Sequence, residues 1–153
     1  MPRYVLPFVI IATVAMSFIC SLFESIILST TIAEIESLKK TRPRRGALLE
    51  TLKREIDATI SSILTLNTVA SSLGSVVVGA LAVKFYSGSG LVAISVGFGA
   101  ILLLFSEVLP KNIGIAHRRA LQPYVVYPIG WMRRVLFPVT WICALVVRPF
   151  VGR

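Results

Sequence analysis

The segment YVLPFVIIATVAMSFICSLF, residues 4–23, contains no charged side chain over 20 residues. An α-helix rises about 1.5 Å per residue, so a helix of this length crosses the hydrocarbon core of a bilayer, which is roughly 30 Å thick. We predict a first membrane span from here to about residue 31. A cleaved signal peptide is the alternative, with Arg3 as its basic start. The length of the apolar run, and the polar Ser21, Glu24 and Ser25 that continue the same helical pattern, favour a span.

The composition of the whole chain agrees with a membrane protein. Of its 153 residues, 56% are hydrophobic and only 15% are charged, and the mean hydropathy is +0.84. Ordinary soluble domains are far more polar. The net charge of +9 comes from Lys and Arg residues that mostly flank apolar runs, so we interpret them as topology signals and expect no nucleic-acid partner. Cys20 and Cys143 lie inside apolar stretches without metal-ligand spacing.

Two further uncharged runs predict two further spans. Residues 58–83 are rich in Ser, Thr, Gly and Ala, which place small side chains at helix contacts. A polar turn, KFYSGSG at residues 84–90, follows this run, and we predict a third span over about 90–109. The second span also contains a small-xxx-small row, typical of a packing seam between helices, formed by Ser71, Ser75 and Gly79.

The loop after the first span carries the orientation signal. Seven of the 16 basic residues fall between positions 39 and 54, and positively charged loops remain on the cytoplasmic side of cell membranes. We therefore expect a multi-pass protein of the cell membrane, the plasma membrane or a bacterial inner membrane, with its N-terminus outside and its C-terminus in the cytoplasm. Leu and Ile residues at helical spacing in residues 47–57 predict an amphipathic helix at the membrane surface or against a partner.

The last apolar segment, residues 135–147, is short. It has 13 residues and is interrupted by Pro138, which favours an interfacial helix over a fourth span. We predict an all-α membrane protein formed by a single transmembrane domain, residues 1–153. Its three spans cover about 4–31, 58–83 and 90–109, and its cytoplasmic juxtamembrane amphipathic helices cover about 33–57 and 115–150.

The third span ends in a motif that combines charge with a helix breaker, LFSEVLP at residues 104–110 followed by Lys111. Glu107 and Lys111 are four residues apart, the spacing that stacks two side chains on one face of a helix. Pro110 lies between them and forbids an undisturbed helix, because it lacks the N–H that the carbonyl of Ser106 would accept from. An interfacial ion pair is one interpretation of the motif, and an ion-binding site is the other.

Polar side chains of the three spans fall at a similar depth, in the cytoplasmic half of the bilayer. A carboxylate in hydrocarbon costs about 2.5–3.5 kcal/mol on insertion scales, so it normally faces a partner or a hydrated cavity. Hydroxyl, amide and carboxylate oxygens suit Mg²⁺, and Na⁺ accepts them in looser geometry. Hydroxyls that only join helices would show the same pattern. The candidate cation ligands are Ser21, Ser25, Asn67, Ser71 and Glu107.

The same motif also carries a family resemblance. SEVLPKNIG, residues 106–114, resembles the G-E-(I/V)-(I/L)-P-K signature at the end of the third span in the CNNM/CorC family of magnesium transporters. SLFES at residues 21–25 resembles the family's S-x-S-E segment, and LNTVAS at residues 66–71 resembles its G-N-x-x-x-N segment. The likeness covers about residues 5–150. This chain departs from the family's Ser, Asn and Gly at Phe23, Ser71 and Ser106.

The resemblance implies a homodimeric three-span domain whose cytoplasm-facing cavity holds Mg²⁺ and exports it, with coupling to Na⁺. Carried over by position, the metal-binding residues are Ser21, Asn67 and Glu107, with Gly114 marking the break beyond the proline. Ser25 and Ser71 are additions on the same helical faces. Family members continue into CBS domains that bind adenine nucleotides, so a separate or removed CBS-type regulatory domain is a further implied partner.

Two kinds of function remain open from the sequence. One is a transporter of divalent cations, Mg²⁺ or another cation, and the other is a non-transporting dimeric membrane scaffold or adaptor that uses the small-residue row of the second span. We do not expect an enzyme, because the chain contains neither H-E-x-x-H nor G-x-S-x-G, and no base adjoins a nucleophile.

Overall fold

The computed structural model of the chain describes residues 4–147, apart from the side chains of Cys143, Ala144, Val146 and Val147. Every regular element in that range is helical, which confirms the prediction of an all-α protein. The elements are α1 (Val5–Ser29), α2 (Ile32–Thr41), α3 (Pro43–Arg54), α4 (Ile56–Phe85), α5 (Gly88–Ile101), the π-helix η1 (Leu102–Val108) and α6 (Leu109–Val147).

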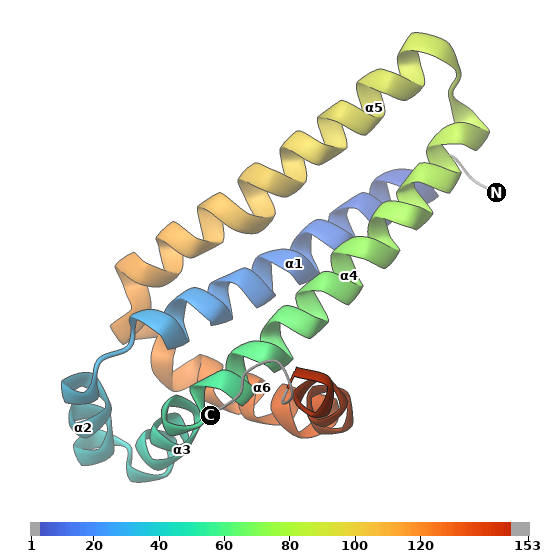
Figure 1. Cartoon of the computed structure of the whole chain (residues 1–153). Helices are drawn as coiled ribbons and strands as arrows, with labels where there is room; N and C mark the ends of the chain where they lie inside the picture. Colours follow the sequence, from blue (N-terminus) through green and yellow to red (C-terminus); the bar gives the residue numbers. More distant parts are fainter. Residues whose placement is uncertain (1–3, 148–153) are drawn as a thin grey trace.

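Three helices are long and apolar enough to cross a membrane: α1, α4 and the continuous helix that starts with α5 (Figure 1). In the most apolar 18-residue stretch of each helix, only 28%, 17% and 11% of the residues, respectively, are buried within the chain. Exposed side chains such as Phe8, Val76 and Val96 therefore need an apolar surrounding. The length and apolar composition of these helices confirm the predicted three spans, and each helix closes its own backbone hydrogen bonds, as hydrocarbon requires.

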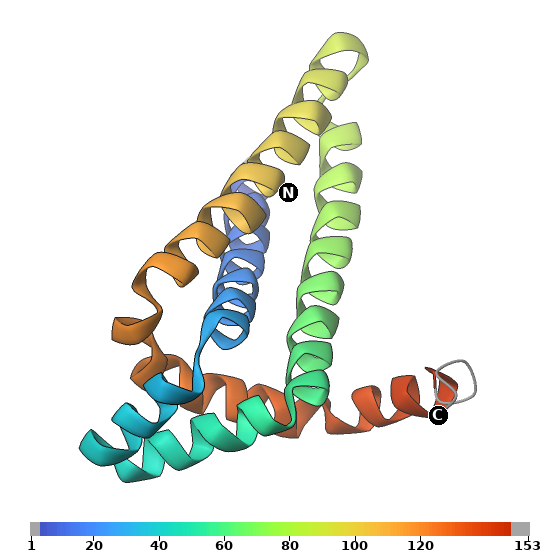
Figure 2. The same cartoon turned by 60° about the vertical axis from the view of Figure 1, so that its left-hand side comes forward.

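The helix α1 lies between α4 and α5 in both views of the bundle (Figures 1 and 2). At the end near the N-terminus, a small apolar cluster of Leu6, Val78 and Phe98 joins the three helices. The turn from α4 to α5 passes through Gly88, whose φ of 54° lies in the left-handed region that glycine adopts without strain.

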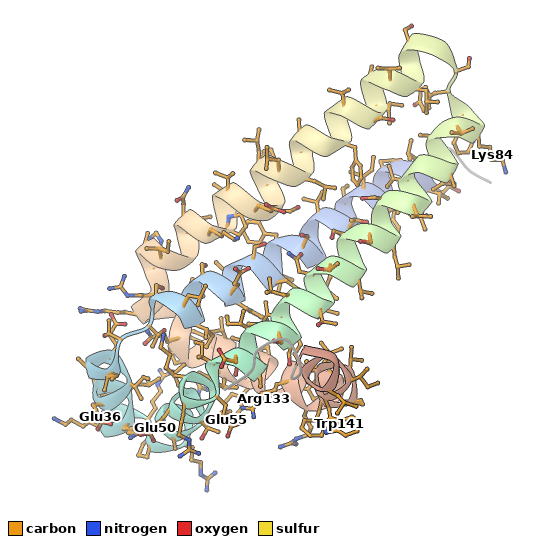
Figure 3. All side chains as sticks on the ribbon, viewed as in Figure 1. Glu36, Glu50, Glu55, Lys84, Arg133 and Trp141 are labelled. Carbon is orange, nitrogen blue, oxygen red and sulfur yellow. The ribbon has the colours of Figure 1, made fainter. Side chains whose placement is uncertain are left out.

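The opposite end of the bundle is closed by α2, α3 and the second part of α6, which we call the juxtamembrane layer (Figure 2). Its main apolar cluster joins this layer to α1 and α4 through buried side chains that include Ile26, Ile35, Leu49, Ile63 and Ile129. Labelled side chains Glu36, Glu50, Glu55, Arg133 and Trp141 lie at this end, and Lys84 lies at the other (Figure 3).

Residues 33–57, for which the sequence suggested helical juxtamembrane structure, form two helices that meet at Arg42 and then run into α4. Pro43 occupies the first position of α3, where its missing N–H costs nothing. The residue before a proline is pushed out of the α-helical region. Arg42 accordingly has φ −140° and ψ 78°, and the chain turns there.

The sequence predicted that Pro110 would disturb the helix at the end of the third span, but the structure places the disturbance before the proline. The chain stays helical through the proline, and the disturbance is taken up just before it by η1, where the N–H of Leu109 donates to the carbonyl of Leu104, five residues earlier. The backbone first leaves helical values at His117, with φ −111° and ψ 17°. Beyond this kink α6 runs across the ends of the spans, and it continues through Pro123, Pro128 and Pro138 (Figure 2).

Candidate functional site

A stripe of four hydroxyl side chains follows one face of α1. Residues at every fourth position lie on the same side of an α-helix, and all four of these residues are buried. The stripe consists of Thr13, Ser17, Ser21 and Ser25, which are 6%, 2%, 0% and 6% exposed. Buried hydroxyls normally have a hydrogen-bond partner, so the partners of these four side chains indicate which helices this face of α1 contacts.

The first two hydroxyls meet α4. The Thr13 hydroxyl donates to the carbonyl of Val9 in its own helix, and its side chain lies so close to Gly74 that a Cβ there would overlap it. The Ser17 hydroxyl donates to the amide oxygen Oδ1 of Asn67, at 2.6 Å. The stripe therefore crosses α4 along Gly74 and Asn67, and Asn67 joins the first two spans by a direct polar contact.

The last hydroxyl of the stripe meets α6. The Ser25 hydroxyl donates to the carbonyl of Leu22, at 2.9 Å. A Cβ built on Gly114 would overlap that same hydroxyl and would lie 3.1 Å from the Leu22 carbonyl oxygen. Only a glycine allows α6 to approach α1 this closely at this point. The structure thus brings Ser25 and Gly114 together.

The third hydroxyl, that of Ser21, has no hydrogen-bond partner among the described residues, although its oxygen is fully buried. Its serine lies one helical turn from Ser17, which binds Asn67, and one turn from Ser25, which contacts Gly114. A buried hydroxyl without a partner costs about 1–3 kcal/mol. The Ser21 hydroxyl is therefore a candidate ligand for an ion or polar group that is not part of this chain.

The other candidates lie around this point with different surroundings. The Ser71 hydroxyl donates to the Asn67 carbonyl at 2.8 Å, within α4. The buried hydroxyl of Ser106, in η1, donates to the Val14 carbonyl of α1 at 3.4 Å. Its neighbour Glu107 has an exposed side chain and makes no hydrogen bond or ion pair within residues 4–147. The described chain alone does not join Glu107 to Ser21 or Asn67.

Lys111 pairs with a different glutamate from the one that its spacing suggests. Its Nζ lies 3.6 Å from Oε1 of Glu24, on α1, where the Glu24 side chain is 14% exposed. The ion pair thus links α1 to the first turn of α6 and leaves the Glu107 carboxylate unpaired.

The donor set indicates which ions this region suits. Within the described part of the chain, no three His, Cys, Asp or Glu side chains gather in a way that would hold a metal. The oxygens shown in contact are the Ser17 hydroxyl with the Asn67 amide oxygen and the Ser71 hydroxyl with the Asn67 carbonyl, and the buried Ser21 hydroxyl lies one helical turn from Ser17. Hard cations prefer such ligands, whereas soft metals prefer sulfur.

A second polar cluster, which we call the Glu34 cluster, joins α2 to α6 next to the kink. The Glu34 side chain is 6% exposed and accepts from Nε of Arg118 at 3.1 Å and from Nε of Arg119 at 2.8 Å. It also accepts from Gln122 Nε2 and from the backbone N–H of Thr31, both at 3.1 Å. Burial alone would raise the pKa of Glu34, but the hydrogen bonds from Arg119, Thr31 and Gln122 and the charge of Arg118 lower that pKa to about 2.

The end of α1 is held by a lysine of α3. Lys53 Nζ donates to the carbonyls of Ile27 and Leu28, at 2.9 and 3.1 Å. These carbonyls belong to the last turn of α1, where the helix dipole favours a cation. Partial burial lowers the pKa of Lys53 from its ordinary value. Lys53 thus connects α3 to the end of the first span, and the Glu34 cluster connects α2 to the second part of α6 within the juxtamembrane layer.

Several of these residues escape reasoning from the sequence alone. Thr13 and Ser17 carry the same four-residue period as Ser21 and Ser25, and that period would have found them. Thr31 and Glu34 match the T-x-x-E pattern of a capping box, which the structure contains. No local pattern indicates that Arg118, Arg119 and Gln122 lie against Glu34, about 85 residues earlier in the chain.

Comparisons with known proteins agree with this architecture. A family model described as the cyclin M transmembrane N-terminal domain, CNNM, matches residues 8–153. UPF0053 protein sll1254 of Synechocystis is 22% identical over 132 residues, which are 86% of this chain and 38% of that protein. DUF21 domain-containing protein At1g55930, chloroplastic, of Arabidopsis thaliana is 23% identical over 106 residues, which are 69% of this chain and 16% of that protein.

A third relative, putative DUF21 domain-containing protein At3g13070, chloroplastic, also from Arabidopsis thaliana, is 23% identical over 131 residues, 86% of this chain and 20% of that protein. The chain therefore spans well under half the length of each of these relatives. UPF0053 and DUF21 domains are CNNM-family domains. The family model covers nearly the whole sequence, which confirms the resemblance found in its motifs: the chain belongs to the CNNM family of membrane domains.

Proposed function

We propose that this domain transports a divalent cation, Mg²⁺, across the membrane. The observation that carries the proposal is the fully buried Ser21 hydroxyl, which has no partner in the described chain although it lies one turn from Asn67's partner Ser17. A cation that accepts the Ser21 oxygen as a ligand would remove the cost of leaving that oxygen unpaired. Membership of the CNNM family supports a transporter-like role.

The neighbouring oxygens suit the cargo. Mg²⁺ takes about six oxygen ligands at roughly 2.0–2.1 Å and commonly keeps several waters. The proposed ligands are Ser21 and Asn67, with Ser25, Ser71 and the backbone at Gly114 completing the set. The amide oxygen of Asn67 is already directed towards α1, where it accepts from Ser17. Rotation of the Ser17 hydroxyl away from it would free that oxygen to bind the cation.

Glu107 has a separate role in this proposal. Its carboxylate is exposed in the single chain, at a level of the bundle where the adjacent Ser106 contacts Val14. An ionised carboxylate cannot face hydrocarbon without a cost of about 2.5–3.5 kcal/mol. We propose that a second copy of the chain covers this face in a homodimer, and that Glu107 supplies negative charge to the transported cation.

The direction and regulation of transport are also proposals. Basic residues concentrated in α2 and α3 favour a cytoplasmic juxtamembrane layer in a cell membrane, with the N-terminus outside. From the family resemblance we propose efflux of Mg²⁺ coupled to Na⁺ entry. A CBS-type regulatory domain would act through the juxtamembrane layer, in which the Glu34 cluster attaches α2 to α6.

A dimeric scaffold without transport is the second candidate, and one observation favours it. Ser75 and Gly79 are exposed on α4, and a Cβ on Gly79 would meet no atom within 4 Å. The small-residue row of the second span therefore does not pack within its own chain around Gly79. It remains open to a helix of another copy.

A flux assay separates the two candidates. The full chain is reconstituted in liposomes with a Mg²⁺-sensitive dye inside, with and without a Na⁺ gradient. Asn67→Ala and Glu107→Gln should each reduce Mg²⁺ flux at least tenfold while insertion and dimerisation persist. Ser95→Ala is the control for the polar deletion, because that exposed hydroxyl on α5 bonds only the Leu91 carbonyl of its own helix. Unchanged flux in both Asn67→Ala and Glu107→Gln would exclude the transport proposal and leave the scaffold.

A further inference from the structure

A basic hollow lies where α2 turns into α3, against the side of α6. It is lined by Arg42, Pro43, Arg44, Arg45 and Tyr127 and has a volume of about 430 Å³. The turn exists because Pro43 ends α2 and begins α3, as described above. Three arginines that flank one proline are thereby brought to a single concave surface of the juxtamembrane layer.

Arg45 is held in place by α6. Its Nη1 donates to the carbonyl of Pro123 at 3.0 Å. Its guanidinium carbon lies 5.9 Å from the ring centre of Tyr124 and 5.5 Å from that of Tyr127, which are distances of cation–π contacts. These contacts orient the guanidinium but leave its positive charge without a counter-charge.

The carboxylates of the juxtamembrane layer are occupied elsewhere. Glu36 and Glu50 both bind Lys39, at 2.8 and 2.7 Å, and Glu55 binds Arg133. Glu34 binds Arg118 and Arg119. Within residues 4–147, none of the three arginines of the hollow forms an ion pair. The hollow therefore concentrates three uncompensated positive charges.

We propose that this hollow binds the phosphate-bearing headgroup of an anionic phospholipid. Guanidinium groups present paired N–H donors that match phosphate oxygens, so three of them suit a phosphodiester better than a single carboxylate. The hollow belongs to the layer that closes the ends of the spans (Figure 2), and lipid headgroups flank the hydrocarbon core that such spans cross. Tyr124 and Tyr127 are exposed there, as aromatic residues are at membrane interfaces.

The proposal does not depend on cation transport, since a scaffold of the same fold would bind lipid in the same way. A free phosphate ion offers the same oxygens, but the lipid is the better match because the hollow stands beside the bilayer. Basic residues near a membrane surface each strengthen binding of anionic lipid roughly fivefold. Removing two of the three arginines should therefore weaken binding by more than tenfold.

The test uses the full chain in detergent and measures binding of short-chain phosphatidylglycerol by thermophoresis, with short-chain phosphatidylcholine as the neutral lipid. The chain should bind phosphatidylglycerol at least tenfold more tightly than phosphatidylcholine. Arg42→Ala with Arg44→Ala should remove that preference. The matched control is Arg54→Ala with Arg134→Ala, which removes two exposed, unpaired charges from the same layer and should change binding less than threefold.

Three results would overturn the proposal: equal binding of both lipids, equal losses in the test and control pairs, or displacement of phosphatidylglycerol by an equal concentration of inorganic phosphate. The last result would assign the hollow to a free anion. Because both mutated side chains are exposed, we expect the double variant to fold. If circular dichroism shows that it does not, Arg44→Gln alone decides the matter, with an expected loss of about fivefold and refutation if binding is unchanged.

Discussion

Replacing Glu34 by glutamine should loosen the attachment of α2 to α6 within the juxtamembrane layer. The carboxylate is nearly fully buried and receives hydrogen bonds from Arg118, Arg119 and Gln122 on α6, as well as from Thr31 at the start of its own helix. Glutamine keeps the size of the side chain but removes the charge. The two arginines then face a neutral amide, which compensates neither of them.

Two arguments give the same magnitude for this change. Removing one member of a buried ion pair costs about 3–5 kcal/mol. The ordinary pKa of the carboxyl is 4.5, and its surroundings lower the pKa of Glu34 to about 2. At about 1.36 kcal/mol for each tenfold change in proton affinity, that difference corresponds to about 3 kcal/mol. We therefore expect Glu34→Gln to reduce the free energy of unfolding by about 3 kcal/mol at pH 7.

The pH dependence follows from the direction of the shift. Because the folded protein holds Glu34 ionised down to about pH 2, its contribution is complete above pH 5 and is lost as the pH falls through 4.5 towards 2. The difference between the natural chain and Glu34→Gln should thus fall to about half of its neutral value at pH 3. Other acidic groups titrate equally in both proteins and cancel in this difference.

The assay is reversible unfolding in mixed micelles of increasing SDS content, followed by helical circular dichroism at pH 7 and pH 3. Glu36→Gln is the matched control, since Glu36 lies on the same helix in an exposed pair with Lys39 and should cost less than about 0.5 kcal/mol. The reasoning is refuted if both variants lose the same stability at pH 7, or if the loss in Glu34→Gln is as large at pH 3 as at pH 7.

The same unfolding assay checks three further predictions. Gly114→Ala should reduce the free energy of unfolding by about 1–3 kcal/mol because the new methyl overlaps the Ser25 hydroxyl. The control Gly79→Ala, whose methyl meets no atom, should be neutral. Equal effects of the two changes would contradict the close approach of α6 to α1. Lys53→Met should cost about 1–2 kcal/mol, since two carbonyls at the end of α1 lose their donor, and a neutral result would count against this cap. Ser17→Ala should cost about 1 kcal/mol by removing the 2.6 Å bond to α4, and a stabilised variant would show that the bond is not favourable.

The three spans and their class could be predicted from the sequence because the requirement is local. A long uncharged run must form a helix in hydrocarbon, whatever its neighbours do, since the backbone has no other hydrogen-bond partners there. The break at Arg42 is equally local, because Pro43 restricts the residue before it. The family motifs around Glu107 and Asn67 are also read directly from the chain, and the family model confirms the membership.

The arrangement of the polar groups could not be predicted in the same way. Spacing in the sequence suggested that Lys111 would balance Glu107, but Lys111 lies against Glu24 of α1 instead. Nothing in the sequence distinguished the Ser21 hydroxyl, which is buried without a partner, from that of Ser17, which binds Asn67. Whether a hydroxyl one helical turn further along finds a partner depends on how α1 and α4 are rotated about their axes and on how closely they approach.

The amino-acid sequence by itself determined that the chain has three membrane-spanning helices, that Pro43 ends the helix before it at Arg42, and to which family the chain belongs. Only the tertiary structure decided which polar atoms meet: Ser17 with Asn67, Ser25 with Gly114, and Glu34 with the arginines of α6. The physical reason is one of range. Hydropathy and proline act on neighbouring residues, whereas hydrogen bonds between helices depend on positions set by the packing of the whole bundle.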